Sequence, residues 1–130
     1  MAGSAVSAGA NLVLGAGGDL TLGAAVTTLG ATGNISLQSA GAIHQDAAVS
    51  ATAAGQSVDM IALGLIVMTQ DASVATIGGG ISLQGGGTVV VGLLDAGSGA
   101  VAINAGGNIL DADAYGDSHV DIVAGALQNH

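Results

Sequence analysis

Apolar side chains alternate with small or polar ones in several short stretches of this 130-residue chain. Residues 33–43, for example, read G-N-I-S-L-Q-S-A-G-A-I, in which Ile35 and Leu37 flank Ser36. A period of two is typical of a β-strand that buries one face, because successive side chains point to opposite sides. The stretch therefore predicts a short strand with Ile35 and Leu37 turned toward a core.

The pattern returns at a nearly constant spacing, so the chain is interpreted as a repeat. Five rows of 23, 23, 23, 20 and 19 residues and an incomplete sixth cover 10–32, 33–55, 56–78, 79–98, 99–117 and 118–130. The first inward position of each row holds Leu12, Ile35, Val58, Ile81, Val101 and Val120. The second inward position holds Leu14, Leu37, Met60, Leu83, Ile103 and Ile122.

Two further columns follow the first strand of each row. A glycine column consists of Gly18, Gly41, Gly64, Gly87, Gly107 and Gly125. Two residues after each glycine stand Leu20, Ile43, Ile66, Val89, Ile109 and Leu127. A third apolar column holds Val26, Val49, Val74 (displaced by two residues) and Leu94. Three apolar columns per row predict a triangular coil, with glycine where the chain turns a corner or takes a positive φ angle.

The main alternative is a helical fold, since alanine is the best helix former and occurs 26 times. The frequent glycines argue against it, because each costs about 1 kcal/mol inside a helix. The repeat therefore predicts an all-β fold, a parallel β-helix with triangular rungs of 19–23 residues and five to six rungs. A right-handed coil is expected from the usual hand of parallel crossovers. We expect 10–130 to form this repeat domain and 1–9 to be a flexible N-terminal segment.

Nine aspartates with no lysine or arginine give a formal net charge of −9. Nucleic-acid binding is not expected, because it relies on basic side chains at phosphates. The absence of cysteine excludes disulfides and thiol catalysis. The longest apolar run, Met60 to Met68, is shorter than the roughly 20 residues of a membrane-spanning helix, so no membrane insertion is expected. The first nine residues contain no basic residue of the kind that opens a secretory signal.

The segment D-A-D-A-Y-G-D at 111–117 resembles the first half of a calcium-binding loop. Asp111 and Asp113 stand at positions 1 and 3, and a glycine follows at position 6. The glutamate that such loops carry at position 12 is replaced by Ile122, and a solvated turn is the alternative interpretation. Calcium held by Asp111, Asp113 and Asp117 is the one cofactor that the sequence suggests, and otherwise we expect none.

Other polar residues lie in columns that predict their orientation. His44 and His119 each adjoin an inward residue and should face solvent, and no two of the three histidines share a row. We therefore predict no histidine metal site. Asn11 and Asn34 occupy one column of adjacent rows and could begin an asparagine ladder, which Ser57 interrupts.

No catalytic site is expected. Ser118, His119 and Asp121 sit too close together on one strand to form a relay, because their side chains alternate between faces. A glycosidase needs two carboxylates about 5–9 Å apart. Asp59 and Asp121, taken as one outward column, would lie three rungs or about 14 Å apart. We therefore predict that the chain is not an enzyme.

The rows resemble the repeats of filamentous-haemagglutinin-like exoproteins, the adhesins and toxins of two-partner secretion. The residues that carry this resemblance are G-D-L-T-L-G (18–23), G-N-I-S-L-Q-S-A-G-A-I (33–43), G-G-I-S-L-Q (79–84) and G-G-N-I-L-D-A (106–112), and the likeness covers 10–127. The resemblance implies a right-handed β-helix in the shaft of a secreted or cell-surface fibre. The N-P-N-L motif of that family's secretion domain is absent from this proline-free chain.

We hypothesise a structural role: a rigid β-helical spacer in the shaft of an extracellular, adhesin-like protein. Its partners would be neighbouring β-helix rungs of the same or an adjacent chain. The first alternative is a self-assembling filament subunit whose uncapped rungs stack end to end, since open strand edges invite pairing. The second alternative is a module stabilised by calcium at Asp111, Asp113 and Asp117.

Overall fold

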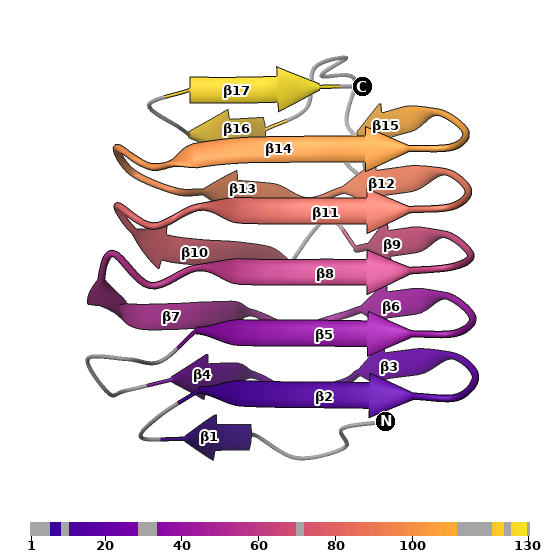
Figure 1. Ribbon diagram of the computed structural model, residues 1–130, viewed down its shortest axis with the longest axis horizontal. Helices are drawn as coiled ribbons and strands as arrows, with labels where there is room; N and C mark the ends of the chain where they lie inside the picture. The colour runs from indigo at the N-terminus through magenta and orange to yellow at the C-terminus, as the bar shows by residue number, and fades with distance from the viewer. Residues whose placement is uncertain are drawn as a thin grey trace.

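The computed structural model describes residues 6–8, 11–28, 34–69, 72–111, 121–123 and 126–129. Its regular structure within these ranges consists of seventeen β-strands, β1 to β17, without a helix. Every strand pairs in parallel with the strand three places earlier or later in the chain, so the chain winds as a β-solenoid (Figure 1). The predicted parallel β-helix is confirmed.

Three sheets enclose the coil. Sheet 1 contains β2 (Leu12–Ala16), β5 (Ile35–Ser39), β8 (Val58–Ala62), β11 (Ile81–Gly85), β14 (Ala100–Ala105) and β17 (Ala126–Asn129). Sheet 2 contains β3 (Leu20–Leu22), β6 (Ile43–Gln45), β9 (Ile66–Met68), β12 (Val89–Val91) and β15 (Ile109–Asp111). Sheet 3 contains β1 (Val6–Ala8), β4 (Val26–Thr28), β7 (Val49–Ala54), β10 (Ser73–Ile77), β13 (Leu93–Asp95) and β16 (Asp121–Val123).

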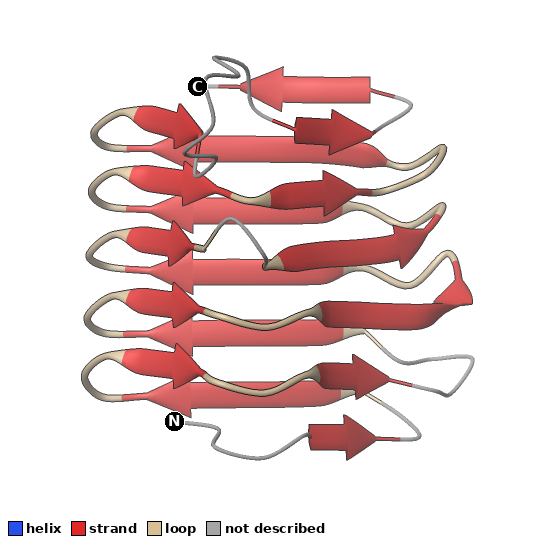
Figure 2. Cartoon of the chain, turned by 180° about the vertical axis from the view of Figure 1, so that it is seen from behind, coloured by secondary structure: helices blue, strands red, loops and turns tan. Residues whose placement is uncertain are grey.

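The coil is right-handed, as the crossover rule predicts. In Figure 1 the near strands of sheet 1 run to the right and the far strands return to the left, while the chain climbs from the N- to the C-terminus. Figure 2 shows the opposite side, where the strands of sheets 2 and 3 follow one another along the back of each turn. The strands of sheet 2 have three residues each, whereas strands of five or six residues occur in both sheet 1 and sheet 3.

The predicted columns stack in register. Leu12, Ile35, Val58, Ile81 and Val101 are consecutive partners in sheet 1, with spacings of 23, 23, 23 and 20 residues. In sheet 3, Val74 pairs with Val49 and Leu94, which confirms the two-residue displacement. The stacked column from Leu12 to Val101 spans about four turns, which is slightly fewer than the five to six rungs predicted.

The last repeat was assigned wrongly from the sequence. Val101 pairs with Leu127, which lies 26 residues further on, and not with Val120. Ile122 pairs with Leu94 in sheet 3 instead of with Ile103 in sheet 1. The local pattern of an apolar residue at every second position is the same in both sheets, so it cannot tell which sheet a strand joins. The fifth repeat is consequently longer than the predicted range of 19–23 residues.

The first strand lies within the segment 1–9. Val6, Ser7 and Ala8 pair with Val26, Thr27 and Thr28, which places β1 at the end of sheet 3.

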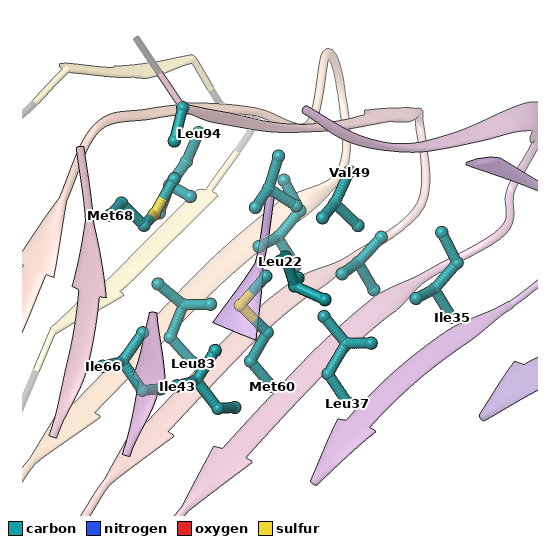
Figure 3. Packing of buried hydrophobic residues seen from close by; sticks show 14 of the residues in the cluster. Leu22, Ile35, Leu37, Ile43, Val49, Met60, Ile66, Met68, Leu83 and Leu94 are labelled. Atoms are coloured by element: carbon teal, nitrogen blue, oxygen red, sulfur yellow. The ribbon is translucent and has the colours of Figure 1, made fainter. Parts of the chain in front are cut away.

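The core is a narrow apolar column filled from all three sheets, as the labelled side chains in Figure 3 show. Its largest fully buried side chains are Leu22, Ile35, Leu37, Ile43, Met60, Ile66, Met68, Ile81, Leu83, Leu94, Ile103 and Gln45. Burying one aliphatic side chain of this size stabilises a fold by about 1.5–3 kcal/mol. Because each turn buries only a few such residues, stability depends on stacking against the turns on both sides.

The corner between sheets 1 and 2 continues the hydrogen-bonded ladder through the glycine column. Gly64 N donates to Gly41 O at 2.8 Å, and Gly87 N donates to Gly64 O at 3.0 Å. These glycines allow close stacking of successive turns and do not have positive φ angles. Positive φ angles occur among the described residues at the corner between sheets 3 and 1, where Gly55 and Gly78 have φ angles of 79° and 78°.

Candidate functional site

Side chains at the corners tie successive turns together. Asn11 Oδ1 accepts a hydrogen bond from Asn34 N at 3.1 Å, and Asn34 Oδ1 accepts one from Ser57 N at 2.8 Å. Ser57 Oγ also donates to Asn34 Oδ1 at 3.2 Å. The asparagine ladder suggested by the sequence is therefore present, and it ends at Ser57 as predicted.

A second inter-turn contact of this kind was missed from the sequence. Asp19 Oδ1 accepts a hydrogen bond from Ala42 N at 2.8 Å, one turn further on, at the corner between sheets 1 and 2. Asp19 precedes the inward Leu20 just as Asn11 precedes the inward Leu12. A short polar residue directly before an inward strand residue is thus the signal that would have found both the asparagine ladder and the Asp19 contact.

We expect Asn34→Ala to destabilise the coil by about 0.5–1.5 kcal/mol, because Ser57 N loses its acceptor. Urea denaturation followed by circular dichroism would measure the change in unfolding free energy. Asn104→Ala is the matched control, since Asn104 is exposed on the outer face of β14. Equal effects of the two substitutions would show that the ladder contributes nothing to stability.

One polar side chain lies inside the core. Gln45 is fully buried in β6, where its Nε2 donates to Ala47 O and to Ser73 O, both at 2.7 Å. Gln45 Oε1 is buried without a hydrogen-bond partner. The side chain bridges its own turn to β10 of the next, where the chain carries the two-residue displacement. The alternation around Ile43 indicates that position 45 faces inward. The hydrogen bonds of the Gln45 amide are known only from the structure.

The proposed calcium ligands remain a prediction. Asp111 ends β15, where its backbone pairs with Val91. Asp113 and Asp117 lie outside the described residues. Within the part of the chain that is described, no group of three or more histidine or acidic side chains is placed to hold a metal ion.

The histidine prediction can be checked at one position. His44 lies between the buried Ile43 and Gln45 in β6 and is half-exposed, so its predicted outward orientation is confirmed. His119 and His130 lie outside the described residues.

The proposed carboxylate column was wrong. Asp59 lies in β8 of sheet 1, whereas Asp121 lies in β16 of sheet 3 and pairs with Leu93. The two residues therefore do not share a face of the coil. The cause is the same as for the last repeat. The sequence pattern predicts that row 118–130 begins with a strand of sheet 1, whereas β16 lies in sheet 3.

A shallow hollow of about 340 Å³ opens at the corner between sheets 1 and 2. Its lining consists of Gly15, Ala16, Gln38, Ser39, Ala40, Ile61 and Leu63. None of these carries a charge, and the Ser39 hydroxyl is engaged with backbone, 2.6 Å from Gly18 O and 3.0 Å from Ala42 O. The hollow thus provides an apolar contact surface and no acid or base.

Comparisons with protein-family models, with curated proteins and with solved structures find no match. In the described part of the chain no helix is long and apolar enough to cross a membrane.

Proposed function

We propose that this chain is a rigid β-helical spacer, a shaft segment of a secreted or cell-surface, adhesin-like fibrous protein. The observation that carries the proposal is the continuity of the inter-turn ladder. It runs through the three sheets and through the corner at Gly41 and Gly64, and side chains such as Asn34 extend it at other corners. The resemblance of the G-x-I-x-L rows to adhesin repeats supports the proposed secreted or cell-surface location.

Stiffness follows from the closed cross-section. Bending the coil would stretch the ladder on one side and compress the packed core on the other. Close-packed protein interiors resist compression, and each stretched turn would lose several backbone hydrogen bonds together. Unopposed aspartates on the surface keep such rods apart laterally, because like charges repel. A stiff, acidic, unbranched rod suits the projection of another domain away from a surface.

Antibody labelling of the source cells tests this proposal. An antibody raised against the folded chain should decorate intact, unpermeabilised cells, and immunogold electron microscopy should place the label on thin projections. Label that appears only after permeabilisation would contradict the surface location. Label spread over a smooth surface without projections would contradict the role in a shaft.

A filament subunit is the second candidate, and the sheet edges favour it. Among the described residues, each sheet ends in strands that have one partner: β1, β2 and β3 at one end and β15, β16 and β17 at the other. Such edges can pair with a further copy. Negative-stain microscopy of the purified chain over a concentration series distinguishes the candidates. Long fibres of constant width would favour the filament, and short uniform particles would favour the spacer.

A further inference from the structure

The third turn differs from its neighbours on the outside of the coil. Where sheet 1 turns into sheet 2, its outward residues are Ile61, Leu63, Leu65 and Val67, here named the aliphatic ridge. The equivalent residues of the second turn are Gln38, Ala40, Ala42 and His44, and those of the fourth are Gln84, Gly86, Thr88 and Val90. Only the third of these turns is aliphatic at all four positions.

The fold does not require these side chains. Met60, Ala62, Ile66 and Met68 of the same segment point inward and are buried, so they supply the third turn's share of the core. Leu63 is 73% exposed, and Ile61 and Leu65 are 38% and 37% exposed. A cluster of exposed aliphatic side chains is typical of an interaction surface, whereas single ones need no explanation.

The ridge projects because the residues beside it are small. Leu63 stands between Ala40 of the preceding turn and Gly86 of the following one. On the side of Ala40 lies the hollow of about 340 Å³, with Leu63 and Ile61 forming its wall. A partner can therefore contact the leucine from above and also place an aliphatic side chain in the hollow beside it.

A second copy of this chain is a poor occupant. Two copies would meet at the crest through Ile61, Leu63 and Leu65, whereas a stable interface takes about 800 Å² from each partner. Each copy also has a net charge of −9 and no lysine or arginine with which to neutralise the other. Contact area and charge both point to a different partner.

The charges around the ridge indicate the chemistry of that partner. Asp59 lies two residues before Ile61 on the same outer face of β8. Asp19 and Asp46 are exposed on the two preceding turns. An aliphatic surface bordered by unopposed carboxylates is complementary to aliphatic side chains bordered by basic ones.

We propose that the aliphatic ridge binds a protein segment that presents aliphatic side chains flanked by lysine or arginine. Leu63 and Leu65 would pack against the segment's apolar face, and one of its side chains would enter the hollow. Asp59, Asp19 and Asp46 would attract the basic flanks. The chain would then act as a docking point on the shaft as well as a spacer.

Binding of a fluorescent synthetic helix of leucine and lysine, measured by anisotropy, tests the proposal. The double variant Leu63→Gln/Leu65→Gln should bind it at least about tenfold more weakly, because two apolar contacts are lost. The matched control is Val13→Gln/Ile77→Gln, which makes the same kind of change at residues that are 67% and 57% exposed and lie outside the ridge. The control should bind within about twofold of the parent chain. Circular dichroism should show the same strand signal for all three proteins, since every substituted side chain points outward.

Charge is tested with a matched helix of leucine and glutamate, which should not bind. Raising the salt from about 50 mM to about 500 mM should weaken binding of the lysine helix, because screening acts on the carboxylates around the ridge. The proposal is overturned if the lysine helix does not bind, if it binds the ridge variant as tightly as the parent, or if the glutamate helix binds equally well.

Two further results would identify a different binding partner for the aliphatic ridge and would thereby overturn the proposal. Sedimentation that shows a dimer of the parent chain, abolished by Leu63→Gln/Leu65→Gln, would make a second copy the occupant. Flotation with phosphatidylcholine vesicles, lost in the same variant, would make it a lipid surface. Absence of both is the expected result.

Discussion

Replacing Leu83 with aspartate is expected to unfold the chain. Leu83 is fully buried in β11, where it stacks between Met60 and Ile103 of the adjacent turns. A carboxylate at this position would be buried without a partner, since the chain contains no lysine or arginine. An unpaired buried charge costs several kcal/mol, and the total stability of a domain is only about 5–15 kcal/mol. The damage would extend to both neighbouring turns, because each is stabilised by stacking on this one.

Far-UV circular dichroism and thermal denaturation would measure this effect. The matched control is Gln84→Asp, which adds the same charge to the next residue of the same strand, where the side chain is exposed. We expect Gln84→Asp to keep the strand signal and to melt close to the parent chain. If both variants melted alike, the inward and outward faces of β11 would have been assigned incorrectly.

Replacing Gly86 with alanine is expected to give the second-largest loss of stability. A Cβ atom on Gly86 would overlap the carbonyl oxygen of Leu63 in the preceding turn. The two turns are held together at this point, since Gly86 N donates to Ala62 O at 3.0 Å. Relieving the overlap therefore requires a backbone shift, and forced shifts of this kind cost about 1–3 kcal/mol.

The corner of the first turn provides the control for this substitution. Gly17 is equivalent to Gly86 in the coil, but a Cβ atom there would have no other atom of the described residues within 4 Å. Its φ angle is not positive, so Gly17→Ala should be neutral or stabilise by about 0.4–1 kcal/mol through the unfolded chain. Urea denaturation of both variants compares the unfolding free energies. A loss in Gly17→Ala as large as that in Gly86→Ala would show that the close contact is not the cause.

Several contacts followed from local pattern alone. The alternation at Ile35, Ser36 and Leu37 predicted which side chains face the core, because a strand turns successive residues to opposite sides. The spacing of the apolar columns predicted which residues stack, since like turns superpose in a coil. His44 was placed outward for the same reason, and the ladder from Asn11 to Ser57 was read from its column.

Other features depend on which turns become neighbours, and no local pattern contains that information. Asp59 and Asp121 looked equivalent, yet they belong to different sheets, since nine residues separate β15 from β16 whereas one to four separate the corresponding strands of earlier turns. One hydrogen bond of Gln45 reaches Ser73, 28 residues away, next to the position where the apolar column of sheet 3 is displaced by two residues.

The repeat, the strand faces and the core residues could all be predicted from the sequence, because the two-residue period and the 23-residue spacing are both visible in the order of apolar residues. Three features required the three-dimensional structure: the pairing of β16 and β17, the close contact at Gly86 that leaves no room for a side chain, and the exposure of the aliphatic ridge. The apolar run from Met60 to Met68 shows the division most clearly. Alternation turns four of its side chains into the core, but Leu63 projects because stacking places Ala40 and Gly86 on either side of it.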